Sequence, residues 1–264
     1  MERTENCATQ NSSLENDHED ERRSARIDLA AAHRIAVMND FHEGIDNHFT
    51  LVVPGSPDSF YVNAFGHHWS EVTASSLLEV SYNGRIVSGE GIADISAVSI
   101  HAPLHRDRPD AKCVLHTHMP YTTAITQLAD MTIEMTGQAA LMFYGKIAYD
   151  YEYNGLAEGP EEGERMAAIM GNKPILMLGN HGVVVTGRSV AHAFHRLYFV
   201  ERVARTQLYS MWTGQPRKQV PHEILEKVRI QFSKPGANLQ KSEAEYHFTA
   251  LKRLLDKQGT NYRD

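Results

Sequence analysis

The sequence has 264 residues, of which 42% are hydrophobic and 22% charged, and its formal net charge is −7. This composition is that of a globular chain with a sizeable core, in one large domain or two small ones. The acidic balance offers no basic field for nucleic acid, and no apolar run is long enough to cross a bilayer, so we expect neither nucleic acid nor a membrane as partner.

The N-terminal residues 1–23 are rich in Glu, Asn, Asp and Ser and contain hardly any large apolar side chain. Such a segment cannot repay the entropy of ordering, which predicts a disordered tail. Two cysteines, Cys7 and Cys113, form no disulfide framework, and the first residues lack the basic-then-apolar pattern of a secretion signal. We therefore expect a cytoplasmic protein.

Helical and strand patterns alternate along residues 24–264. Apolar periodicity and capping residues predict helices over 24–38, 95–105, 121–129, 189–212, 222–232 and 242–257. Short apolar runs between turn signals predict strands over 48–53, 60–63, 77–82, 84–88, 111–115, 175–178 and 183–185. The alternation around one core predicts an α/β fold, in a single domain with a helical extension at the C-terminal end.

The first candidate site residues are His116 and His118, which follow the apolar run of Cys113, Val114 and Leu115. Side chains two apart on a strand point to the same face, so both imidazoles can approach one ion. An isolated His-x-His pair often arises by chance on a surface strand. Here the pair ends a core strand, where two imidazoles need a partner, and this favours a metal role.

A third histidine, His181, lies in the segment Gly179-Asn180-His181-Gly182 between two apolar strands. The glycines allow a close approach of the backbone at this turn. In isolation, His181 is equally well read as a turn residue that bonds its own backbone. Together with His116 and His118, it would complete a set of three imidazole ligands.

Two stretches around these histidines carry a family resemblance. They are Arg108-Pro109-Asp110-Ala111-Lys112-Cys113-Val114-Leu115-His116-Thr117-His118, and Gly179-Asn180-His181-Gly182-Val183 followed by Ser189-Val190-Ala191-His192-Ala193-Phe194. In this order they resemble the class II aldolase/adducin family over residues 27–212. The resemblance implies a three-layer α/β/α sandwich around a mostly antiparallel sheet, assembled as a homotetramer with sites at subunit contacts. It also implies one divalent metal per subunit on His116, His118 and His181, with zinc expected and manganese or iron as alternatives.

The sequence departs from the sugar-phosphate aldolases of that family at three places. Those enzymes have a proton-carrying glutamate nineteen residues before the first metal histidine, where this chain has Ala97. The position of their catalytic tyrosine corresponds to Ile147 in this chain. Their phosphate-binding loop corresponds to residues 62–73, which here contain the bulky sequence Asn63-Ala64-Phe65-Gly66-His67-His68-Trp69 in place of exposed backbone N–H groups. A phosphorylated sugar is therefore not the expected substrate.

Three histidine ligands without an acidic fourth leave open positions on an ion, which can polarise a carbonyl or carboxylate. We therefore expect a divalent-metal-dependent carbon–carbon lyase, of decarboxylase or aldolase type, acting on a non-phosphorylated hydroxy- or keto-acid. Two alternatives stay open. One is a non-catalytic assembly module like an adducin head, which Ala97 suits. The other is a non-haem iron oxygenase, because three histidines also suit iron(II).

The remaining site candidates lie in segments that can approach the histidines. His101 and Asp94 are the expected proton carriers. The expected substrate contacts are Asn47, His67, His68, Arg108 and Tyr149. For each of them the alternative is a surface residue or a residue that only supports the metal ligands.

Overall fold

The computed structural model describes residues 2–157, 159–234 and 240–264, and within them eight strands form one sheet. The strands are β1 (His48–Val53), β2 (Ser56–Asn63), β3 (Leu77–Ser81), β4 (Ile86–Ser88), β5 (Cys113–Thr117), β6 (Ile147–Asp150), β7 (Ile175–Leu178) and β8 (Gly182–Gly187). Their order is β4-β3-β2-β1-β5-β8-β7-β6. Only β6 and β7 pair in parallel, so the sheet is mostly antiparallel, as expected.

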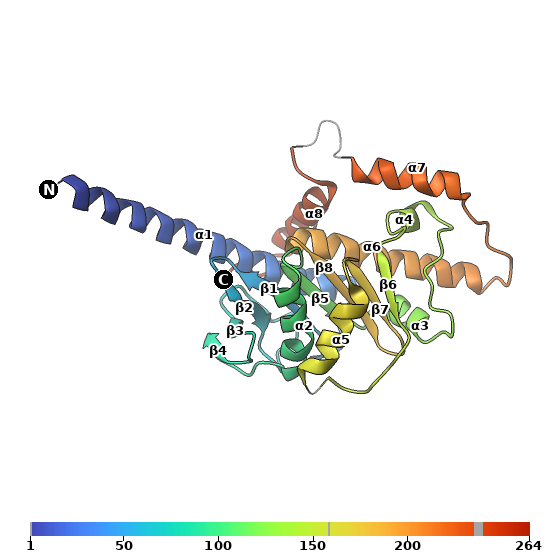
Figure 1. Cartoon of the computed structure of the whole chain (residues 1–264), viewed down its shortest axis with the longest axis horizontal. Helices are drawn as coiled ribbons and strands as arrows, with labels where there is room; N and C mark the ends of the chain where they lie inside the picture. The colour runs from blue at the N-terminus through green and yellow to red at the C-terminus, as the bar shows by residue number, and fades with distance from the viewer. Residues whose placement is uncertain (1, 158, 235–239) are drawn as a thin grey trace.

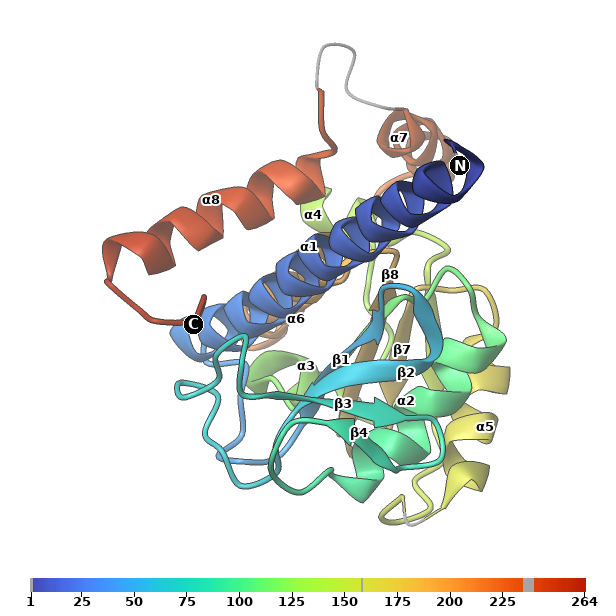
Figure 2. The same cartoon turned by 90° about the vertical axis from the view of Figure 1, so that its left-hand side faces the viewer.

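Helices cover both faces of this sheet (Figures 1 and 2). On one face lie α2 (Ile95–Asp107) and α5 (Pro160–Met170), which contact β1, β5, β6 and β7. On the other lie α1 (Glu2–Met38), α3 (Pro120–Thr126) and α6 (Val190–Met211), with α8 (Glu243–Lys257) packed outside α1 and α6. The predicted α/β/α layering is confirmed.

The helix α1 differs from the expectation for residues 1–23. A single helix extends from Glu2 to Met38 over most of the segment predicted to be a disordered tail, while Met1 lies outside the described residues. Two contacts hold the middle of the helix: Arg22 Nε donates to the carbonyl O of Pro54 at 3.0 Å, and Arg26 pairs with Glu19 at 3.2 Å. Polar composition does not reveal the first of these contacts, because Arg22 and Pro54 lie 32 positions apart in sequence.

Two helices and a strand were not predicted: α4 (Gln138–Leu141), α5 and β6. The helix α5 begins with Pro160 and has Glu161 and Glu162 in its first turn, a helix-start signal that the sequence prediction overlooked. Its Gly163 permits a close crossing with α2, because a Cβ there would lie 2.0 Å from the carbonyl O of Ser99.

The strands that matter for the histidines are β1, β5 and β8. In the antiparallel register, His48 of β1 faces His116 of β5, and His116 in turn faces Val184 of β8. The turn between β7 and β8 carries His181 to the same edge of the sheet. The C-terminal part contains α7 (His222–Ser233), which lies beside α4 (Figure 1). No helix in the described part of the chain is long and apolar enough to cross a membrane.

Candidate metal centre

Three imidazoles converge at the end of β5. The ligand atoms of His116, His118 and His181 all lie within 4.8 Å of one another, and no other group of three or more potential ligands occurs among the described residues. The Nε2 atoms of His116 and His118 are 3.2 Å apart. Nitrogens bound at about 2.0–2.1 Å to one tetrahedral ion lie about 3.3 Å apart, so this spacing fits a shared ion.

Backbone geometry brings His181 to the other two. Asn180 has a positive φ of 57°, which Asn tolerates better than most residues, and the turn closes with the His181 N–H donating to the carbonyl O of Leu178. The next residue, Gly182, lies against β5: a Cβ there would be 2.5 Å from the carbonyl O of Thr117 and 2.8 Å from Cδ2 of His118. A glycine is needed for this close approach.

The second ring nitrogen of two ligands is already engaged. His116 Nδ1 donates to the carbonyl O of Val183 at 3.1 Å, which leaves Nε2 as the free lone pair. His118 Nδ1 bonds the carboxylate of Glu43, which has the same effect on its Nε2. Carbonyl and carboxylate partners of this kind orient metal-binding histidines and fix their tautomers.

Burial keeps His116 and His181 neutral. Desolvation, followed by the neighbouring imidazoles, lowers the pKa of His116 well below its usual range, and burial lowers the pKa of His181 to about 4. Neutral imidazole is the form that binds a metal ion. The donor set, its spacing and the neutral state of these two rings therefore fit a divalent ion of the zinc group.

Asn47 lies directly against this triad. It is buried and has a φ of 73°, and its Oδ1 accepts a hydrogen bond from the His118 N–H at 3.2 Å. Its buried Nδ2 has no hydrogen-bond partner among the described residues. An unpaired buried donor beside the triad is what a substrate oxygen would satisfy, which fits the expected substrate contact.

A chain of buried side chains extends from the triad toward α2. Starting at its far end, His105 Nδ1 donates to the carbonyl O of Ala111 at 2.7 Å. For neutral rings, Thr50 then donates to His105 Nε2 at 2.8 Å and accepts from His101 Nδ1 at 2.6 Å. His101 Nε2 accepts in turn from His48 Nδ1 at 2.9 Å. The backbone carbonyl therefore sets the tautomer of every ring in the chain, including His48, whose ring lies against His116.

The two expected proton carriers lie at different points of this chain. His101 is fully buried with both ring nitrogens bonded, so any role it has acts through His48. Asp94 caps α2, accepting from the backbone N–H of Ser96 at 2.8 Å and from its hydroxyl at 2.7 Å. The same hydroxyl lies 3.3 Å from His48 Nε2. Asp94 is therefore linked to the triad only indirectly: it bonds the Ser96 hydroxyl, which lies beside His48, and the ring of His48 lies against that of His116.

The aromatic loop that contains His67 and His68 is separate from the triad. His67 is exposed, while His68 bonds the hydroxyl of Ser70 at 2.7 Å. The ring of His68 packs edge-on against His42, with centroids 4.9 Å apart, and His42 precedes Glu43 in the loop that reaches His118. These histidines therefore border the loop beside the triad, and their contact with a substrate stays a prediction.

The structure corrects the expectation for Arg108. It is a buried residue at the end of α2, where its guanidinium bonds Asp110 at 2.7 Å and the carbonyl O of Lys173 at 2.7 Å. These partners precede β5 and β7, whereas the triad follows the other ends of those strands. Arg108 therefore lies at the opposite end of these strands from the triad. There it joins two connecting segments and does not face a substrate at the triad.

Tyr149, the other expected substrate contact that needs correction, lies on the opposite face of the sheet from His116. Its neighbour Ala148 packs with Val114 on the α2 and α5 face, which is the face of His116. Alternation along β6 turns Tyr149 to the opposite face, where its hydroxyl accepts from the backbone N–H of Ile133 at 3.1 Å. It supports the core and does not face the triad.

Three residues near the triad were missed from the sequence. Glu43 bonds His118, His48 packs its ring 5.1 Å from that of His116, and Tyr153 lies with its ring 6.1 Å from that of His181. The strand pattern alone could have indicated His48, since a polar residue opens an otherwise apolar strand. Glu43 and Tyr153 lie in irregular segments that carry no such signal.

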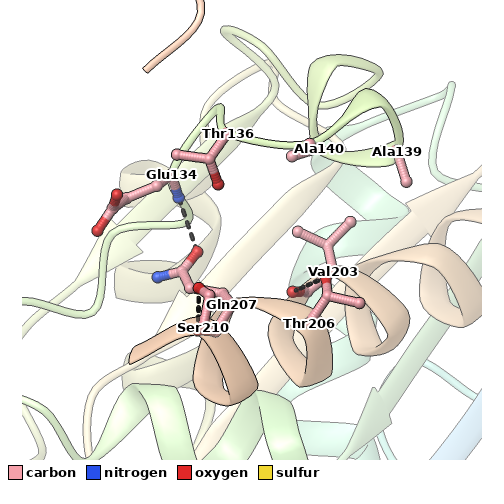
Figure 3. Close-up of a pocket in the computed structure, with 9 residues that line it drawn as sticks. Glu134, Thr136, Ala139, Ala140, Val203, Thr206, Gln207 and Ser210 are labelled. Atoms are coloured by element: carbon pink, nitrogen blue, oxygen red, sulfur yellow. Dashed lines mark hydrogen bonds between the residues drawn. The ribbon is translucent and has the colours of Figure 1, made fainter. Parts of the chain in front are cut away.

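A cavity lies elsewhere, between α6 and the segment that leads into α4 (Figure 3). It has a volume of about 210 Å³ and is lined by small and polar side chains. Gln207 there bonds the backbone N–H of Glu134 at 2.9 Å and the carbonyl O of Thr132 at 2.9 Å, and the Glu134 carboxylate pairs with Arg217. The amide of Gln207 and the carboxylate of Glu134 are therefore already paired within the protein.

Comparisons with known proteins agree with this fold. The family model "Class II Aldolase and Adducin N-terminal domain" matches residues 27–208. A Pseudomonas aeruginosa protein that carries the name of the class 2 aldolases is 30% identical over 90% of this chain and 91% of its own length. Human beta-adducin is 28% identical over 90% of this chain, which spans only 34% of the adducin. The crystal structure of an aldolase II superfamily protein from Pseudomonas syringae is 33% identical, with a TM-score of 0.84 over 92% of this chain and 96% of that one.

The chain therefore belongs to the class II aldolase and adducin family.

Proposed function

We propose that the protein is a divalent-metal-dependent carbon–carbon lyase, of decarboxylase or aldolase type, that acts on a non-phosphorylated hydroxy- or keto-acid. The observation that carries this proposal is the convergence of three imidazoles, two of which have their second ring nitrogen already bonded. A divalent ion held there would supply Lewis-acid polarisation of a substrate carbonyl or carboxylate. Zinc suits the donor set, with manganese or iron as alternatives.

The residues around the triad suit an oxygen-rich, unphosphorylated substrate. Asn47 offers a buried amide donor without a partner. Ala97, at the position of the aldolase glutamate, is fully buried with Phe60 and Val62 in an apolar cluster, so it offers no proton carrier. The carboxylate that bonds a triad histidine is that of Glu43, which contacts His118. Proton transfer by these groups is therefore expected to differ from that of the sugar-phosphate aldolases.

The test is to load purified protein with zinc, manganese or iron(II) and measure carbon dioxide and aldehyde release from a panel of hydroxy- and keto-acids. His181→Ala removes one ligand of the triad, and His222→Ala, an exposed histidine of α7, is the matched control. The proposal expects turnover in the wild type and in the control, and its loss in His181→Ala. Turnover that is equal in both variants, or absent with every metal and acid, contradicts it.

A second candidate is an assembly module like the adducin head. The specific observation that favours it is the similarity to beta-adducin together with the inert residue at position 97. Under this reading, the three histidines would bind metal without turnover, and the protein would associate with a larger assembly. An oxygenase with iron(II) in the triad would instead consume oxygen with the same acids, which an oxygen electrode detects.

The remaining parts of the proposal concern the setting of the enzyme. We expect a small-molecule substrate, one metal ion in the triad of each subunit, and a cytoplasmic homotetramer whose sites lie at subunit contacts. Light scattering of the purified chain tests the tetramer. Exposed aromatic residues near the triad, such as Tyr153 at 51% exposure, are the surfaces that such contacts would cover.

A further inference from the structure

A second pair of facing histidines lies on the other side of the sheet from α2 and α5. His195 belongs to α6, which packs on the sheet, and His247 belongs to α8, which packs on α6. Their Nδ1 atoms are 3.2 Å apart, and their rings stand nearly perpendicular at 80°. The two residues are 52 positions apart in sequence, so the packing of α8 on α6 creates this pair.

The spacing of the two nitrogens equals that of His116 and His118, at 3.2 Å. With metal–nitrogen bonds of about 2.0–2.1 Å, two nitrogens this far apart subtend about 103° at one ion, close to the tetrahedral angle. An ordinary hydrogen bond between two neutral rings accounts for the same distance, with one ring donating and the other accepting. The two explanations differ in whether a metal ion displaces the shared proton.

The surroundings favour neutral, well-oriented rings. Phe199 lies 4.8 Å from the ring of His195, and Tyr198 lies 4.8 Å from the ring of His247. Burial lowers the pKa of His195 to about 4 and also lowers the pKa of His247. Both imidazoles therefore present lone pairs at neutral pH, and the aromatic rings restrict how far they can turn.

The charged neighbours on both helices are already engaged. On α6, the guanidinium of Arg196 donates to the carbonyl O of Thr186, and His192 bonds Ser189 and the guanidinium of Arg188. On the α8 side, the carboxylate of Glu245 closes a capping box with Ser242. Among the described residues, no third side chain joins the pair within ligand distance. Water would therefore complete the coordination of an ion held by the two histidines.

We propose that His195 and His247 form a second, two-histidine site for a divalent transition ion such as zinc or copper(II), which ties α8 to α6. Imidazole is the ligand that these ions prefer among nitrogen donors. The ion is structural in this site, since its two ligands come from helices that pack outside the sheet. The site is independent of the function proposed for the triad.

The experiment counts zinc ions per chain after equilibrium dialysis against free zinc, using metal analysis of folded protein. We expect two ions in the wild type, one in His247→Gln, and two in the control His222→Gln. The double variant His118→Ala with His181→Ala, which leaves a single histidine in the first site, should retain one, and adding His247→Gln to it should leave none. If His247→Gln does not fold by circular dichroism, His195→Gln removes the other ligand of the pair and should give the same count.

A second measurement follows α8 itself by amide hydrogen exchange in the background of His118→Ala with His181→Ala. Zinc should slow exchange over residues 243–257 severalfold, and His247→Gln should abolish the slowing. Equal zinc counts in His247→Gln and His222→Gln, or exchange in α8 that zinc does not change, would show a hydrogen-bonded histidine pair only and overturn the proposal.

Discussion

His48 and His116 face each other across the antiparallel strands β1 and β5, with ring centroids 5.1 Å apart. This pairing connects the triad to the buried chain that ends at the carbonyl O of Ala111. The tautomer of the ring beside the first metal ligand is therefore set by a backbone group in the segment between α2 and β5. Four of the following predictions test how such supporting groups act on the fold and the triad.

Replacing Glu43 tests the partner of His118. Glu43→Gln removes the carboxylate that bonds His118 Nδ1 and should weaken zinc binding by about 10–100-fold, the usual effect of losing such a partner. Competition with a chromophoric chelator measures the affinity. Glu223→Gln, an exposed change in α7, is the control and should leave the affinity unchanged. Equal affinities in the two variants would show that the carboxylate does not orient His118.

The close approach of β8 to β5 is tested at Gly182. A Cβ there would lie 2.5 Å from the carbonyl O of Thr117 and 2.8 Å from His118 Cδ2. Gly182→Ala should lower the free energy of unfolding by about 1–3 kcal/mol and also weaken zinc binding, because His118 must move. Gly137→Ala is the matched control, since nothing lies within 4 Å of its added Cβ. Urea unfolding that does not distinguish the two variants would refute this account of the turn.

Asn47 combines a positive φ with a hydrogen bond to the backbone of His118. Asn47→Ala and Asn47→Gly both remove the acceptor, but only alanine is strained at a φ of 73°. The alanine variant should therefore be less stable than the glycine variant by about 1–2 kcal/mol. Chemical unfolding of both proteins checks the difference, and an alanine variant as stable as the glycine variant speaks against strain at this position.

Buried histidines make stability depend on pH. Burial lowers the pKa of His33 and of His105 to about 4, from an ordinary value of 6.5. Between these values the unfolded chain binds protons that the folded chain excludes, so the stability present above pH 6.5 is lost as the pH falls toward 4. Each group contributes roughly 3 kcal/mol to this loss. Unfolding free energies measured from pH 7.5 to 4.5 should fall steadily, whereas a flat profile down to pH 5 would contradict the burial of these rings as neutral groups.

Much of the fold could be predicted from local patterns. The bounds of β1 and β7 agree with the predicted strands, and α6 and α8 agree with the predicted helices to within one residue at each end. The helix α5 was overlooked although Pro160 and the two glutamates after it mark a helix start, whereas β6 depends on its parallel pairing with β7. Residues whose structure is determined by a distant contact carry no local signal.

The candidate site likewise combines features that a local pattern predicts with features that depend on distant contacts. The strand spacing of His116 and His118 was sufficient to bring two rings together, and the turn brought His181. Which residues support them depends on strand register and face. Tyr149 was assigned to the site although alternation turns it to the other face, while His48 was overlooked although the β1 register places it against His116. A sequence shows proximity along a strand, but it does not show which strands are neighbours.

The most direct test of the central claim is zinc X-ray absorption on protein loaded with one equivalent of zinc. Ligation by His116, His118 and His181 predicts three imidazole nitrogens at about 2.0–2.1 Å with an oxygen ligand, and one imidazole fewer in His181→Ala. Zinc that is lost on dialysis, or a spectrum that His181→Ala leaves unchanged, would contradict the three-histidine centre on which the proposed function depends.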